Sequence, residues 1–115
     1  MARVSQTTQQ IVLTGLEPEL TEPTADGDIV DCGQVALMVV NGSVSSINVT
    51  VAATAEQDGL DLEDLIVAVP AGDTRLIGPL PKRTFGQPSS EGAAAGRAYV
   101  NYSAQASVDR AVISF

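Results

Sequence analysis

The side chains that could carry acid–base or nucleophilic chemistry are few in this chain. Its 115 residues include no histidine, one cysteine and one lysine. Without histidine, the chain cannot use the histidine bases of serine or cysteine catalysis, or histidine metal ligands. Cys32 therefore has no histidine partner, and Lys82 follows Pro81 in a loop where nothing indicates burial. We expect that the protein is not an enzyme.

Two acidic stretches have the oxygen ligands that a hard cation prefers. Asp26 and Asp28 flank Gly27, and Asp31 follows closely, an arrangement whose chemistry suits Ca²⁺. The spacing of an EF-hand loop is absent, because no Gly and Glu stand at its fixed offsets. Residues 56–64 form a second acidic stretch. We expect both stretches to be solvated turn carboxylates, and we expect no metal ion or other cofactor.

The sequence shows neither a phosphate-binding loop nor an aromatic stacking surface. Gly92-Ala-Ala-Ala-Gly96 lacks the following lysine and the helix start of a phosphate cradle. Aromatic residues make up 3% of the chain, whereas a base-stacking or sugar-binding face needs a row of rings. Tyr99 and Tyr102 fall on opposite faces of their predicted strand. We expect Tyr102 in the core and Tyr99 at its rim. The remaining aromatic residues are Phe85 and Phe115.

The charge balance limits the partners. The formal net charge is −8 and the isoelectric point is about 4.1. Binding a nucleic-acid backbone needs clustered cations, and an anionic lipid surface makes the same demand. The cationic residues are instead scattered along the chain: Arg3, Arg75, Lys82, Arg83, Arg97 and Arg110. We therefore expect no nucleic-acid partner and no membrane partner.

Composition also bears on the surface and the compartment. Charged residues are 17% of the chain, below the usual ~25%. Either part of the surface faces a partner, or the turns are built from Ser, Thr, Gly and Asn instead. A single cysteine permits no intrachain disulfide. Residues 1–13 do not form a secretion signal, and the apolar run 35–40 is far shorter than the ~20 residues of a membrane span. We expect the chain to fold in a reducing cytoplasm.

The apolar patterning predicts short strands and no amphipathic helix. Residues 35–41 form the strongest buried-strand candidate, with Leu37 in its middle, and Ile47-Asn-Val-Thr-Val-Ala-Ala-Thr54 alternates cleanly. The predicted strands are 11–14, 28–32, 35–41, 47–54, 65–69, 74–77, 97–103 and 107–115. Six to eight short strands predict an all-β fold, a single β-sandwich with Greek-key or jelly-roll-like connections.

The remaining segments are interpreted as an arm and loops. Residues 1–10 form a flexible N-terminal arm, or a strand that orders only on a neighbour, and residues 11–115 form the sandwich domain. Residues 15–33, 56–64 and 82–96 are predicted to be loops. Asn41-Gly42 is typical of a hairpin turn, which here could extend through Ser46.

The segment Val69-Pro-Ala-Gly-Asp-Thr-Arg-Leu-Ile-Gly-Pro-Leu-Pro81 is the most distinctive part of the sequence. Leu76 and Ile77 point to opposite faces, so one supplies core and the other a contact. The segment resembles small all-β virion proteins of tailed phages of actinobacteria. The likeness covers roughly residues 11–115, and the other stretches that carry it are Leu20–Asp28, Val35–Asn48, Val100–Ser103 and Val108–Phe115.

The resemblance implies a capsid decoration (cement) protein or a small head structural protein. Such a subunit binds the outside of the assembled major capsid protein lattice, often as a homotrimer, and is located on the exterior of the phage head. Two alternatives stay open. One is a head–tail connector or tail-tube subunit. The other is a bacterial adhesin-like or carbohydrate-binding sandwich, against which the few aromatic residues and the missing signal peptide weigh.

Overall fold

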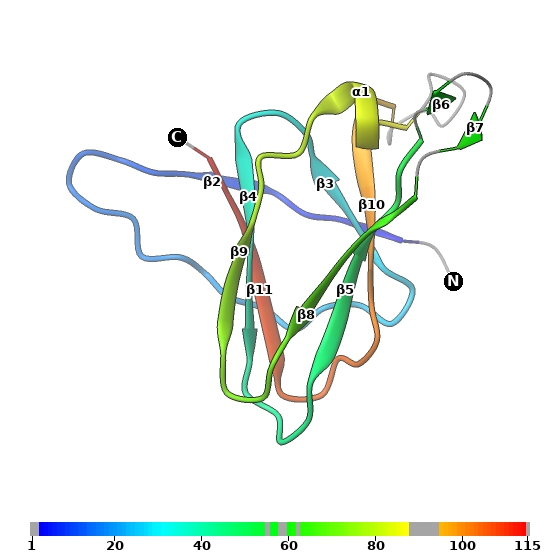
Figure 1. The fold of residues 1–115 in the computed structure, drawn as a ribbon. Coiled ribbons are helices and arrows are strands. Elements are labelled where there is room, and N and C mark those ends of the chain that lie inside the picture. Colours follow the sequence, from blue (N-terminus) through cyan, green and yellow to red (C-terminus); the bar gives the residue numbers. More distant parts are fainter. Residues whose placement is uncertain (1–2, 55, 58–59, 62, 88–94, 115) are drawn as a thin grey trace.

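The fold is a β-sandwich, as the sequence predicts (Figure 1). The computed structural model describes residues 3–54, 56–57, 60–61, 63–87 and 95–114. Within these ranges, a five-stranded sheet has the order β1-β3-β10-β5-β8 and a four-stranded sheet has the order β2-β11-β4-β9. A separate two-stranded sheet, β6-β7, and one turn of helix, α1, complete the described elements.

The strands are short, and from residue 28 onward their bounds follow the predicted ranges, except for β6 and β7. The five-stranded sheet contains β1 (Val4–Ser5), β3 (Asp28–Asp31), β10 (Arg97–Tyr102), β5 (Ile47–Val51) and β8 (Leu65–Val69). The four-stranded sheet contains β2 (Thr8–Gln10), β11 (Val108–Ser114), β4 (Val35–Asn41) and β9 (Thr74–Ile77). The small elements are β6 (Glu56–Gln57), β7 (Leu60–Asp61) and α1 (Lys82–Phe85).

The core lies between the two sheets and is built mainly of valine. Alternate residues of β4 and β5 are buried, because successive side chains of a strand point to opposite faces. Leu37 of β4 and Val49 of β5 are fully buried, so the prediction that Leu37 is a core residue is confirmed. The intervening residues of β4 face outward and form the outer surface of the four-stranded sheet.

Most connections cross from one sheet to the other, which gives the non-sequential strand order. The Asn41-Gly42 pair is one such crossing. Its interpretation as a hairpin turn is wrong, because β4 and β5 lie in different sheets. The buried Asn41 amide donates hydrogen bonds to the carbonyls of Ser45 (2.8 Å) and Val69 (2.9 Å). The crossing runs from Asn41 to the start of β5 at Ile47. Asn41 thus holds this connection against the end of β8.

The N-terminal segment belongs to the sandwich. Residues 1–10 were expected to form a flexible arm or to order only on a neighbour, but β1 pairs in parallel with β3 and β2 pairs in parallel with β11 of the same chain. The segment therefore runs from the edge of one sheet to the edge of the other. Backbone pairing at an edge needs no apolar side chains, so these polar residues give no strand signal.

Three further predictions are corrected. Ile11-Val-Leu-Thr14 is not a strand; Gly15 donates its backbone N–H to Val12 O (2.9 Å) in a turn instead. The predicted loop 56–64 contains the pair β6 and β7. The predicted loop 82–96 begins with α1, and its residues 88–94 lie outside the described residues, as does Phe115.

Candidate interaction surfaces

Asp28, a residue of the candidate cation loop, is fully buried and pairs with Arg110 across the two sheets. Arg110 Nε donates to Asp28 Oδ2 at 2.5 Å, and a terminal guanidinium nitrogen donates to Asp28 Oδ1 at 3.1 Å. β3 carries the carboxylate and β11 carries the guanidinium, so the ion pair joins the five-stranded and four-stranded sheets. The prediction of a solvated turn carboxylate is wrong for Asp28.

Three more side chains complete the hydrogen bonds of this carboxylate. Tyr102 Oη donates at 2.9 Å, Thr24 Oγ1 at 3.1 Å and Gln6 Nε2 at 3.2 Å. Asp31 pairs instead with Arg97 Nε at 2.8 Å near the surface. Among the described residues, no three His, Cys, Asp or Glu side chains gather where they could hold a metal ion. Two carboxylates of the candidate cation loop, Asp28 and Asp31, are therefore partners of arginines.

One signal in the sequence shows that Arg110 needs a buried counter-charge, but it does not identify the residue that supplies it. Arg110 stands in a strand whose neighbours Val108, Ala111 and Val112 are buried. A charged side chain in such a strand is almost never fully buried unless it is paired. Burial lowers the pKa of Arg110, but its hydrogen bonds and charge interaction with Asp28 outweigh that effect and raise the pKa overall. A buried arginine therefore implies a carboxylate on a facing strand.

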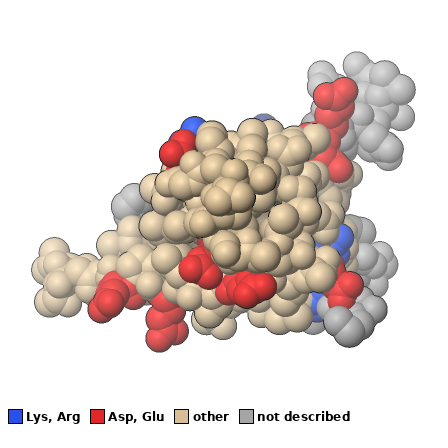
Figure 2. Space-filling view, turned by 90° about the horizontal axis from the view of Figure 1, so that it is seen from below, with Lys and Arg blue, Asp and Glu red and all other residues tan. Residues whose placement is uncertain are grey.

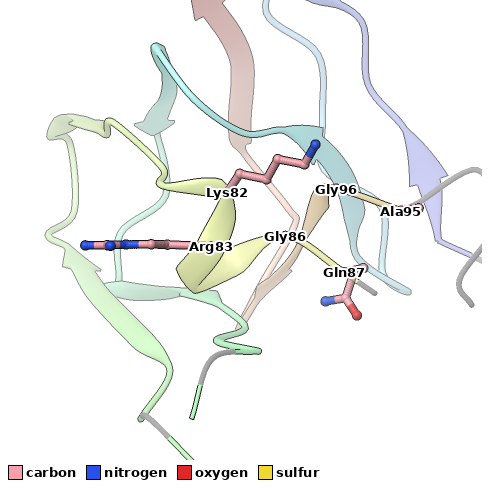
Figure 3. A pocket seen from close by; sticks show the side chains of 6 residues that line it. All are labelled: Lys82, Arg83, Gly86, Gln87, Ala95 and Gly96. Atoms are coloured by element: carbon pink, nitrogen blue, oxygen red, sulfur yellow. The ribbon is translucent and has the colours of Figure 1, made fainter. Parts of the chain in front are cut away.

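The two nucleophile candidates lie near enough for the Lys82 charge to lower the pKa of the Cys32 thiol, but larger effects oppose it. Cys32 is half-buried, and burial followed by the nearby Asp31 charge raises the pKa of its thiol. The thiolate, which is the nucleophilic form, is therefore disfavoured. Lys82 lies on α1 and lines an open pocket of about 610 Å³ with Arg83, Gly86, Gln87, Ala95 and Gly96. Figure 3 shows the Lys82 and Arg83 side chains pointing away from each other, so these cations do not converge on a common anion.

The aromatic residues occupy separate places. Tyr102 is buried in the core, as predicted, and Phe85 packs at the core margin. Tyr99 is half-buried, and the Arg3 guanidinium lies over its ring at 4.4 Å from the centroid. The described aromatic rings therefore form no exposed row on which bases or sugars could stack.

The Tyr102–Asp28 hydrogen bond predicts a specific alkaline sensitivity. Burial raises the pKa of the Tyr102 phenol well above its usual value of 10.0, and the Asp28 carboxylate raises it further. Above about pH 10 the unfolded chain releases this proton while the folded chain keeps it. The contribution of Tyr102 to the free energy of unfolding is therefore complete below pH 10 and falls as the pH rises. Chemical denaturation at several pH values should show a shallower fall for Tyr102→Phe than for the parent. An unchanged slope for Tyr102→Phe would contradict the assignment.

The two outer faces of the sandwich differ in character. On the five-stranded sheet, the outward positions of the central strands include Asn48, Thr50 and Asn101. On the four-stranded sheet, neighbouring outward positions pair Met38 with Leu76 and Ala36 with Ile113. We call these last four residues the apolar face. Leu76 is 66% exposed and Ile77 is 5% exposed, which confirms that the two point to opposite sides.

A groove of about 400 Å³ lies on the apolar face. Its walls include all four residues of that face together with Ile11 and Pro79, and none of its described lining residues is charged. Gly78 forms part of the lining because the chain passes close to β4 there: a Cβ atom at this position would lie 2.3 Å from Val35 O. The Val69–Pro81 segment thus supplies one wall of the groove.

A long loop between β2 and β3 projects from the edge of the four-stranded sheet (Figure 1), and its residue Ile11 lines the groove. The Gln9 side chain closes its base, since Nε2 donates to Glu19 O (2.9 Å) and Oε1 accepts from Glu19 N (2.8 Å). Near its start, Ile11, Val12 and Leu13 are all exposed, and Leu13 is fully so. Figure 2 shows the projection ending in uncharged residues, with acidic side chains nearer the body. We call residues 11–13 the apolar tip.

The edge strand β8 is a third exposed apolar feature. It reads Leu65-Ile-Val-Ala-Val69, contains no charge, and pairs only with β5 within the described part of the chain. Ile66 is 62% exposed. The neighbouring edge strand β9 differs, because Arg75 interrupts it and pairs with Asp73 at 3.6 Å. Charges and prolines commonly protect sheet edges, so an uncharged edge such as β8 is suited to pairing with another strand.

Comparisons with family models, with curated proteins and with solved structures give no match. Of the helices in the described residues, none has the length and apolar character needed to cross a bilayer. The functional interpretation therefore depends on the surfaces themselves and on the sequence resemblance.

Proposed function

We propose that this protein is a non-enzymatic structural subunit of a phage virion that decorates the outer surface of the assembled head. The observation that carries the proposal is the open, uncharged β8 edge on a sandwich with a net charge of −8. An exterior position also suits a protein that DNA would repel. The resemblance of residues 11–115 to actinobacteriophage head proteins supports the same function.

In the proposed complex, β8 pairs with an exposed strand of the major capsid protein. Main-chain hydrogen bonds give affinity in strand addition, and alternate side chains give specificity. Ile66 and Ala68 alternate with the inward-facing Val67 and would lie against the capsid surface. Because the subunit binds only the assembled lattice, each bound copy stabilises the head by mass action. The protein would be made in the host cytoplasm and end on the head exterior.

Co-sedimentation with bare capsids tests this proposal. We expect the parent protein to pellet with capsids in many copies per particle. Ile66→Lys places a charge on the open edge and should weaken binding by tenfold or more, which corresponds to about 1.4 kcal/mol. Val44→Lys is the matched control, because it places the same charge on an exposed valine that lies outside β8, in the β4–β5 connection.

Two results would contradict the proposal. A parent protein that stays in the supernatant would show that it does not decorate capsids. Equal binding of the parent and Ile66→Lys would show that β8 is not the contact. Binding at a single vertex would instead favour the head–tail connector.

A further inference from the structure

We infer that the groove on the apolar face receives the apolar tip of a second copy of this chain. The inference relies on the proposed function only in treating the protein as a subunit that assembles. The capsid contact is assigned to the β8 edge and the copy-to-copy contact to the groove, so the two interactions use different residues.

The apolar tip is held where its own chain cannot cover it. Leu13 is fully exposed, and Val12 and Ile11 are 49% and 44% exposed. The paired hydrogen bonds between Gln9 and the Glu19 backbone close the loop at its base, and Ile11 N–H donates to Ser114 O (2.8 Å), so the loop projects away from the body beyond Ile11. Three consecutive exposed aliphatic residues on a protruding loop are typical of a contact with another molecule.

The groove has the size and chemistry to accept such a tip. Its volume of about 400 Å³ is adequate for a small number of aliphatic side chains. Most of its lining comes from β4, β9 and β11, which belong to one sheet, so the groove is formed before any partner arrives. A preformed groove does not need to be ordered on binding, which favours affinity.

Charge restricts where two copies of this chain can meet. Two copies of net charge −8 repel each other, so they can approach closely only through surfaces that bring few carboxylates together. Residues 11–16 contain no charged residue, and Glu17 and Glu19 follow behind them. The described groove lining is also uncharged. The tip and the groove therefore form a contact that excludes carboxylates from its centre.

The placement of the two features within one copy also fits self-association. Ile11 belongs both to the apolar tip and to the groove wall, so the tip and the groove are adjacent within one copy. Two copies could exchange tips reciprocally around a two-fold axis, or three copies could each place a tip in the next groove and close a ring. The contact is the same in both cases, and the particle mass distinguishes them.

Cross-linking between two different variants tests the contact directly, without capsids. In a Cys32→Ser background, one variant carries Val12→Cys in the tip and the other carries Gln34→Cys at the groove. Mixing them under mild oxidation should give a disulfide-linked heterodimer with at least tenfold higher yield than a control pair. The control pair combines Val44→Cys with Gln34→Cys, because Val44 is also an exposed valine but lies at the opposite end of β4. Equal yields from the two pairs would overturn the inference.

The mass of the protein in solution gives the second readout. We expect the parent to sediment as an oligomer, and Leu13→Ser to raise its dissociation constant at least tenfold, while Val44→Ser leaves it unchanged. A parent that is monomeric at all concentrations, or equal effects of the two serine variants, would overturn the inference. Capsid binding is measured separately through Ile66, so failure of self-association and failure of head decoration give different results.

Discussion

Replacing Leu37 by Asp is expected to leave the chain unfolded at 25 °C. Leu37 is fully buried in the middle of β4, between the pairing strands β11 and β9. An aspartate there would place an unpaired charge among valines, at a cost that exceeds the total stability of about 5–15 kcal/mol of a typical domain. Far-ultraviolet circular dichroism and a thermal melt measure this outcome.

The matched control for Leu37→Asp is Val44→Asp. It makes a similar aliphatic-to-aspartate change at an exposed position in the connection after the same strand. Surface substitutions of this kind usually change stability by less than about 0.5 kcal/mol, so this variant should melt like the parent. A Leu37→Asp protein that melts at the parental temperature would show that the core assignment is wrong.

Replacing Asp28 by Asn is expected to lower the free energy of unfolding by about 3–5 kcal/mol. Asparagine has nearly the same shape, but it leaves the Arg110 guanidinium buried without its counter-charge. Arg110→Met should lower the free energy of unfolding by a similar amount, because it leaves the Asp28 carboxylate buried without its counter-charge. Denaturant titration measures both variants.

Two further variants separate the buried pair from an ordinary ion pair. Asp28→Asn combined with Arg110→Met should lose less stability than the two single changes together, because no unpaired charge remains. Asp31→Asn breaks the pair with Arg97, where the Asp31 side chain is 44% exposed, and should lose less than about 1 kcal/mol. Strict additivity at Asp28 and Arg110, or equal losses at Asp28 and Asp31, would contradict the inter-sheet ion pair.

The strands of the core could be predicted because their signal is local. β4 contains six consecutive apolar residues, and β5 alternates apolar with polar residues. The pattern within each strand therefore indicates which of its side chains are buried. The outward orientation of Leu76 follows from the same period of two. These patterns were sufficient to predict an all-β sandwich and the burial of Leu37 and Tyr102.

The features that join the sheets could not be predicted, because they depend on strand order. Asp28 and Arg110 are separated by 82 positions, and only the alternation of strands between sheets brings them together. The N-terminal strands pair through their backbones and carry no apolar pattern. For the same reason Asn41-Gly42 was assigned to a hairpin: a turn signal does not tell whether the next strand joins the same sheet.

The candidate surfaces depend on this arrangement as well. The groove combines residues of β4, β9 and β11 with Ile11, which are distant in the sequence. The sequence of β8 predicts a strand but does not show that it lies at an edge, since edge position is a property of the sheet. A low charged fraction was the one signal of exposed apolar surface, and it did not locate that surface.

The most direct test of the proposed function is a reconstruction of bare capsids mixed with the parent protein. The proposal predicts additional density at many equivalent positions over the outer shell, with the β8 edge against the capsid protein and the apolar face directed toward neighbouring copies. Shells without added density, or density confined to one vertex, would contradict head decoration.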